Sequence, residues 1–201
     1  VMMSNIDLRF EHIKTFSFLH GQLPTNMVDE FNGYSNGNST INLEDDIPKG
    51  LCNLFKSSGR SFVSMYSEQL PLGGGSSFEN VDIKCKSMKV VDKSKNSYCL
   101  PMDCDTDYTT RSISFSTMLF LKVPEQVNDD TQHHMGHAHF SWGVNTAPDH
   151  LSLRPKQDKF IVPKVGRFVV FPSWLKHSVL PFEGDGVMRV LLANFNMGFS
   201  V

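Results

Sequence analysis

The chain has 201 residues, of which 40% are hydrophobic and 20% charged, with a formal net charge of −2. This is the composition of one ordinary globular domain, and so balanced a charge gives no electrostatic reason to expect nucleic acid or an anionic membrane as a partner. No apolar run approaches the ~18–20 residues of a membrane-spanning helix, and residues 1–14 lack the basic-then-apolar order of a secretory leader. The four cysteines form no CxxC pair, which predicts reduced thiols and a cytoplasmic location.

The first third of the sequence predicts helices. Residues 21–34 place Pro24 near a helix start, followed by apolar residues at helical spacing. The Gly-rich stretch 70–81 is the best candidate boundary, so a helical N-terminal part is expected over residues 1–70. Within it, residues 47–70 carry a second set of apolar side chains at three-and-four spacing: Leu51, Leu54, Phe55, Phe62, Val63 and Tyr66.

Strands are expected after this boundary. Residues 81–91 alternate between polar and apolar, and residues 112–123 form a long β pattern that Pro124 ends. Many short strands between Gly and Pro turns are typical of a sandwich or barrel. We therefore expect a single domain over 1–201, with the N-terminal helices packed on a jelly-roll double-stranded β-helix over 81–201. Further short strands are expected at 137–144, 159–162, 166–171, 177–182 and 188–197.

Two polar residues stand out in the last two of these strands. His177 follows a Pro-Ser-Trp turn, and Arg189 lies within an otherwise apolar strand. A lone histidine is most often a structural residue, but an unpaired arginine is costly to bury and needs a carboxylate or a ligand. We expect the two side chains to project into the same opening of the barrel and to form part of a site.

The segment 163–196 resembles the C-terminal half of iron(II)- and 2-oxoglutarate-dependent oxygenases. It is most similar to the small prolyl-hydroxylase-like proteins of marine phages and bacteria, and the resemblance extends over about residues 85–196, with a weaker echo in 21–34. In such enzymes, oxidative decarboxylation of 2-oxoglutarate is coupled to hydroxylation of a substrate. The resemblance implies that His177 is a metal ligand and that Arg189 binds the far carboxylate of 2-oxoglutarate. The shared landmarks are Gly166, the turn 171–175, His177, the turn 184–186, Arg189 and Asn194, together with residues 118–125 upstream.

The first metal motif of that family is altered in this chain. The family has His-x-Asp or His-x-His before the long strand, and the preceding landmark proline is present as Pro101. Asp105 stands at the second ligand position, but Asp103 occupies the place of the histidine, and no histidine occurs between His20 and His133.

Two interpretations keep the family fold. In the first, Asp103, Asp105 and His177 hold Fe(II), or a harder ion such as Mn(II), and the protein hydroxylates a small molecule or a peptide. In the second, the metal site is lost, and a non-catalytic barrel binds an organic acid through Arg189 or binds a partner. The sequence indicates neither the substrate nor the oligomeric state.

A third interpretation is a cupin-type metalloprotein that uses the histidines of 133–139. Two histidines at alternate positions of one strand share a face. The second cupin motif is formally met by Gly166, Pro172 and His177, but residues 141–144 supply no glutamate for the first motif.

Overall fold

The computed structural model describes residues 9–13, 16–33, 39–40, 49–67, 81–95, 113–130, 132–142 and 157–199. Its helices are α1 (Thr25–Gly33) and α2 (Lys49–Ser67), and a short 3-10 turn spans Gln132–His134. Its strands are β1 (Arg9–Ile13), β2 (Phe16–Gln22), β3 (Ser39–Thr40), β4 (Val81–Ser94), β5 (Ile113–Lys122), β6 (Ala138–Ser141), β7 (Asp158–Ile161), β8 (Arg167–Pro172), β9 (Lys176–Val179) and β10 (Val187–Phe199).

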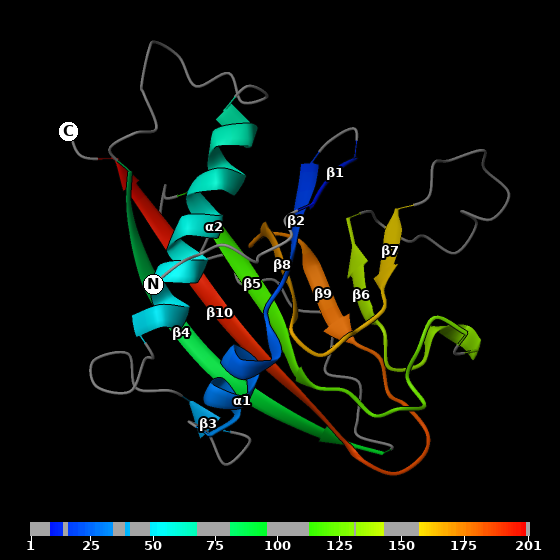
Figure 1. Cartoon of the computed structure of the whole chain (residues 1–201). Helices are drawn as coiled ribbons and strands as arrows, with labels where there is room; N and C mark the ends of the chain where they lie inside the picture. The colour runs from blue at the N-terminus through cyan, green and yellow to red at the C-terminus, as the bar shows by residue number, and fades with distance from the viewer. Residues whose placement is uncertain are drawn as a thin grey trace, which may run out of the picture.

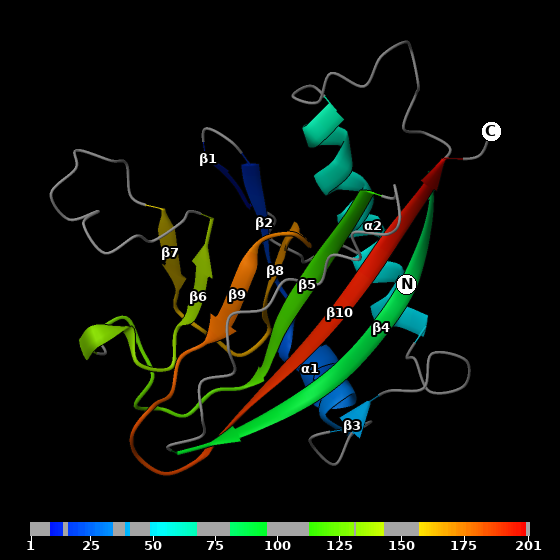
Figure 2. The same cartoon turned by 180° about the vertical axis from the view of Figure 1, so that it is seen from behind.

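The strands form two antiparallel sheets. A seven-stranded sheet has the order β1-β2-β8-β5-β10-β4-β3, and a three-stranded sheet has the order β7-β6-β9. Both helices lie on one side of β10, in front of the large sheet in Figure 1 and behind it in Figure 2. This mainly β architecture with helices packed on one sheet is the predicted double-stranded β-helix fold.

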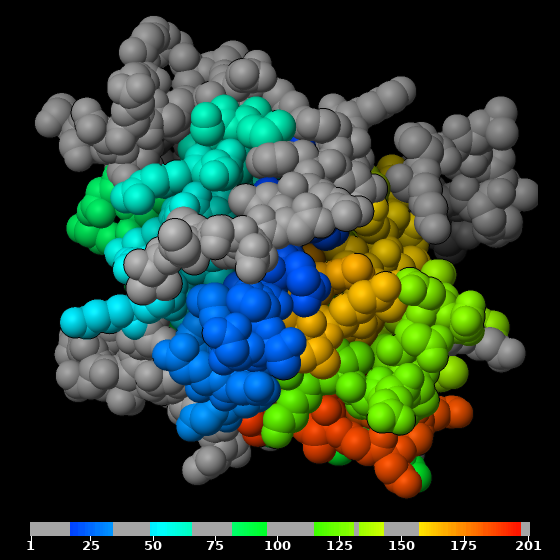
Figure 3. Space-filling view, viewed as in Figure 1, coloured from blue at the N-terminus to red at the C-terminus, as the bar shows by residue number. Residues whose placement is uncertain are grey.

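The helix-covered face of the large sheet is an aromatic core. Phe195 of β10 stacks on Phe115 of β5 with ring centroids 5.0 Å apart and an interplanar angle of 10°. Phe55 of α2 meets Phe195 edge-on at 6.1 Å, which confirms the predicted apolar stripe of this helix. Figure 3 shows this side of the molecule, with α2 (cyan) and α1 (blue) over the sheet.

The opposite face of the large sheet forms the barrel interior, against the small sheet. Met188 and Val190 of β10 belong to this interior cluster, together with Phe140 of β6. Leu191 and Ala193 belong to the helix-side cluster. Successive residues of β10 therefore alternate between two buried layers, because side chains alternate along a strand.

The N-terminal part differs from the prediction at its start. Before the two predicted helices, β1 and β2 form an antiparallel hairpin, and β2 pairs with β8 in the large sheet. Phe18 lies in the interior cluster and Leu19 in the helix-side cluster, so β2 is buried on both faces and has no clear polar alternation. Most of the candidate boundary at 70–81 lies outside the described residues. No helix of the described part of the chain is long and apolar enough to cross a membrane.

Candidate metal and cosubstrate site

A tight turn carries the chain from the large sheet to the small one. The backbone amide of Leu175 donates to the carbonyl of Pro172 at 3.0 Å, and Leu175 is fully buried while Trp174 is exposed. The buried hydroxyl groups of Ser173 and Ser116 lie 2.9 Å apart, which ties the turn to β5. His177 is the second residue of β9, directly after this turn.

His177 is buried inside the barrel, with 8% of its surface exposed. Its ring lies 4.9 Å from that of Phe171 and 6.3 Å from that of Phe140, centroid to centroid. Its Nδ1 lies 3.1 Å from the carbonyl oxygen of Leu175. Since a carbonyl can only accept, Nδ1 carries the proton in this contact and Nε2 carries the lone pair. This is the arrangement in which a histidine binds a metal ion through Nε2.

Arg189 has a different environment from that predicted. Its Nε and one terminal nitrogen donate to the two carboxylate oxygens of Asp92 at 2.7 and 2.8 Å, and its other terminal nitrogen lies 3.4 Å from the carbonyl oxygen of Asn32 at the end of α1. The hydrogen bonds from Arg189 hold the pKa of Asp92 below its usual value, and those to Asp92 raise the pKa of Arg189. The pair therefore ties β10 and β4 to α1.

The structure does not bring His177 and Arg189 together. Arg189 alternates with the interior residues Met188 and Val190 and reaches α1 on the helix-covered face, whereas His177 lies among interior aromatic rings. The prediction that both side chains share one opening is wrong. A role for Arg189 in binding the cosubstrate stays a prediction, and this geometry does not support it.

Lys93 supplies a positive charge inside the barrel. It pairs in register with Met188, and directly paired residues of neighbouring strands share a face, so its side chain points into the interior. It is 7% exposed, and its Nζ donates to the carbonyl oxygen of Val179 at 2.9 Å. Val179 lies two residues after His177 on β9, so the ammonium group lies beside the strand that carries the imidazole.

The predicted carboxylate ligands, Asp103 and Asp105, lie outside the described residues. Within the described ranges, no group of three or more His, Cys, Asp or Glu side chains could hold a metal ion. Inside the barrel, the described part of the chain thus offers one oriented imidazole, that of His177, and one buried ammonium group, that of Lys93.

The cupin interpretation is wrong for a structural reason. Ala138 and Phe140 of β6 face the interior, so His137 and His139, which alternate with them, face the outer surface. His139 stacks on Phe160 of β7 at 4.5 Å and lies 3.9 Å from a carboxylate oxygen of Asp158. These histidines cannot share a metal ion with the inward-facing imidazole of β9.

Part of the chain matches a known protein-family model. Residues 110–196 match the family model described as "Putative 2OG-Fe(II) oxygenase". Over these residues, the chain is similar to the 2OG-Fe(II) oxygenase superfamily. A search of curated proteins found no match.

Solved structures share the fold of this oxygenase-like protein. HygX from Streptomyces hygroscopicus, with nickel and 2-oxoglutarate bound, has a TM-score of 0.58 and 9% identity over 90% of this chain and 83% of that chain. AviO1 from Streptomyces viridochromogenes has a TM-score of 0.52 and 11% identity over 89% of both chains. A prolyl-4-hydroxylase from Pseudomonas putida has a TM-score of 0.51 and 17% identity over 92% and 90%.

Sequence reasoning missed Lys93 and the pair of Ser116 and Ser173. Lys93 is one of several lysines in residues 84–95, and most of the others are exposed. Only the pairing of Lys93 with Met188 across β4 and β10 distinguishes it. In this chain, the inward-facing positive charge near the start of β10 is carried by Lys93 of β4.

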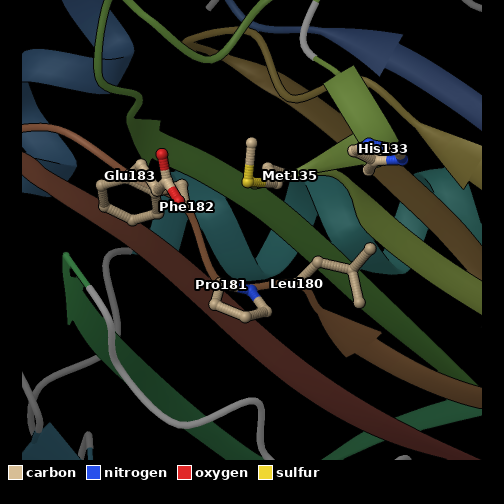
Figure 4. Close-up of a pocket in the computed structure, with 6 residues that line it drawn as sticks. All are labelled: His133, Met135, Leu180, Pro181, Phe182 and Glu183. Atoms are coloured by element: carbon tan, nitrogen blue, oxygen red, sulfur yellow. The ribbon is translucent and has the colours of Figure 1, made fainter.

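A hollow lies between the 3-10 turn and the connection from β9 to β10. It has a volume of about 360 Å³ and is lined by the 3-10 turn and the β9–β10 connection. Figure 4 shows His133 at one side, away from Phe182 and Glu183. Its lining residues are His133, Met135, Leu180, Pro181, Phe182 and Glu183.

Proposed function

We propose that this protein is an iron(II)- and 2-oxoglutarate-dependent dioxygenase that hydroxylates a small molecule or a peptide. The observation that carries the proposal is the buried His177 imidazole, whose Nδ1 faces the carbonyl oxygen of Leu175 and whose Nε2 is therefore the metal-binding nitrogen. Asp103 and Asp105 would supply the carboxylate ligands. A set of two carboxylates and one imidazole suits Fe(II) and also Mn(II).

In this proposal, each group of the chain has a separate task. Bound iron would activate dioxygen for the paired oxidation of 2-oxoglutarate and substrate. His177 and the two aspartates hold the ion, and the rings of Phe140 and Phe171 keep water from its imidazole side. Lys93 binds the far carboxylate of the 2-oxo acid, since its ammonium group is buried and lies near Val179, beyond His177 along β9.

Solved structures with a similar fold are compatible with a small-molecule substrate. HygX has been solved with nickel, 2-oxoglutarate and hygromycin B bound, although at 9% identity this substrate does not transfer to the present chain.

The free thiols of Cys52 and Cys85 support the cytoplasmic location that forms part of the proposal.

The test measures metal binding and turnover together. The purified protein is titrated anaerobically with Fe(II) or Mn(II), with and without 2-oxoglutarate, and succinate is measured after air is admitted. We expect the protein to bind the metal ion more tightly when 2-oxoglutarate is present. The variant His177→Ala should abolish this increase in affinity. His139→Ala is the matched control, because its imidazole lies on the same sheet but faces outward. If the folded protein shows no metal binding that depends on 2-oxoglutarate, it is the non-catalytic barrel instead.

A second variant tests the position of the altered ligand. Asp103→His restores the residue of the family motif, and it should increase succinate release if position 103 is a metal ligand. Equal succinate release by this variant and by the chelator-treated wild type would place the site elsewhere.

A further inference from the structure

Two histidines outside the barrel point their ring nitrogens at each other. Nδ1 of His134, in the 3-10 turn, lies 3.3 Å from Nδ1 of His137. His137 is 2% exposed, while His134 is exposed to solvent. Neither residue takes part in the proposed oxygenase site, because both lie on the outer side of the small sheet.

The tautomer of His137 is fixed by the backbone. Its Nε2 lies 3.0 Å from the carbonyl oxygen of Asn128, which can only accept, so Nε2 carries the proton. The lone pair is then on Nδ1, which faces His134. Metal-binding histidines in proteins commonly have this arrangement, in which the second ring nitrogen donates to a carbonyl and orients the ring.

His134 is exposed but held in place. Its ring stacks on that of Phe160 with centroids 4.1 Å apart and an interplanar angle of 7°. Its backbone φ is 57°, and that of His133 is 54°, so two successive non-glycine residues adopt the left-handed region. Such strained residues tend to cluster at functional sites.

The separation of the two nitrogens suits a shared metal ion. Zinc–histidine bonds are about 2.0–2.1 Å long. If one ion bound equally to two nitrogens 3.3 Å apart, the angle between its two bonds would be about 105°, close to the tetrahedral value. We propose that His134 and His137 form a second, surface site for a divalent transition-metal ion such as Zn²⁺. The ion replaces the proton that the two nitrogens otherwise share.

The coordination of this site is open. Within the described ranges, no third His, Cys, Asp or Glu joins the pair, so water or an added ligand fills the remaining positions. Imidazole ligands favour Zn²⁺, Ni²⁺ or Cu²⁺ over Mg²⁺ or Ca²⁺. The site is therefore weaker than a closed structural zinc site and selective for this class of ion.

The test is a calorimetric titration with Zn²⁺ in a His177→Ala background, which removes the barrel ligand. His134→Asn is compared with His133→Asn, because asparagine tolerates the left-handed backbone at both positions. We expect His134→Asn to weaken Zn²⁺ binding roughly tenfold or more, and His133→Asn to leave it unchanged. Mg²⁺ should not compete.

Two results would overturn the proposal: equal Zn²⁺ affinity in the two asparagine variants, or no Zn²⁺ binding in their parent protein. Should His177→Ala fail to fold, the ring-nitrogen NMR signals of the wild type give the same answer. Zn²⁺ must then shift Nδ1 of both His134 and His137, and unshifted signals contradict the site. Neither readout depends on 2-oxoglutarate. Failure of the zinc site therefore leaves the proposed oxygenase function intact, and failure of the oxygenase function leaves the zinc site intact.

Discussion

Arg189 and Asp92 lie directly opposite each other on β10 and β4, and their side chains form a two-pronged ion pair on the helix-covered face of the large sheet. Only 9% of the arginine side chain and 21% of the aspartate side chain are exposed. Arg189, the arginine of the family-like motif, is therefore paired with a carboxylate of the protein itself. Its contact with the carbonyl oxygen of Asn32 also links it to α1. In the same pair of strands, the charged side chain that faces the barrel interior is Lys93.

This ion pair predicts a stability effect. Asp92→Asn removes one partner of a mostly buried pair, and it should lower the free energy of unfolding by about 3 kcal/mol because Arg189 is left buried without its counter-charge. Urea unfolding followed by circular dichroism measures the loss. The matched control is Asp82→Asn, whose exposed pair with Lys84 should contribute less than about 1 kcal/mol. Equal losses in the two variants would contradict the structural role of Arg189.

The same pair predicts a pH dependence. The folded-state pKa of Asp92 is lowered from 3.8, chiefly by the hydrogen bonds from Arg189. A lowered folded-state pKa gives stability that is present above 3.8 and is lost as the pH falls through the folded-state value. The difference in unfolding free energy between wild type and Asp92→Asn should therefore shrink between pH 6 and pH 3. A difference that stays constant over this range would show that the carboxylate charge is not responsible.

Lys93 predicts a change in cosubstrate binding. Lys93→Met keeps an apolar stem but removes the ammonium group, and hydrogen bonds to charged groups contribute about 1.5–3 kcal/mol. The 2-oxoglutarate concentration for half-maximal succinate release should rise by roughly 10- to 150-fold. Lys122→Met, on the exposed side of neighbouring β5, is the control and should leave it unchanged. If Arg189→Met raises this concentration while Lys93→Met does not, the acid is held as the family resemblance implies.

The close packing of α2 on the large sheet predicts opposite effects for two glycines. A methyl group on Gly59 would collide with the ring of Phe115, whereas one on Gly50 would meet nothing within 4 Å. Gly59→Ala should destabilise the fold by about 1–3 kcal/mol through overpacking. Gly50→Ala should stabilise it by about 0.4–1 kcal/mol, because alanine restricts the unfolded chain. Thermal unfolding measures both, and a stabilised Gly59→Ala variant would contradict this packing.

The extent of sequence prediction follows from what each pattern contains. The stripe of α2 was readable because one face is apolar and the other polar. The turn 171–175 and the motif around His177 predicted an inward histidine, and His177 is buried in the barrel. Arg189 could not be assigned to a face, because β10 is buried on both sides and its apolar run has no alternation. The inward position of Lys93 could not be predicted either, because only the pairing of β4 with β10 shows which face of the sheet this residue occupies.

The two sheets differ greatly in strand length. β4 and β10 have 14 and 13 residues, whereas β6, β7 and β9 have four each. Backbone amides in the short strands should exchange with deuterium well before those at the centre of β10, because fewer hydrogen bonds must break together. Since His177 belongs to a short strand, its part of the proposed metal site can open while the long strands remain folded. Loss of the ion would then be governed by this local fluctuation and not by global unfolding.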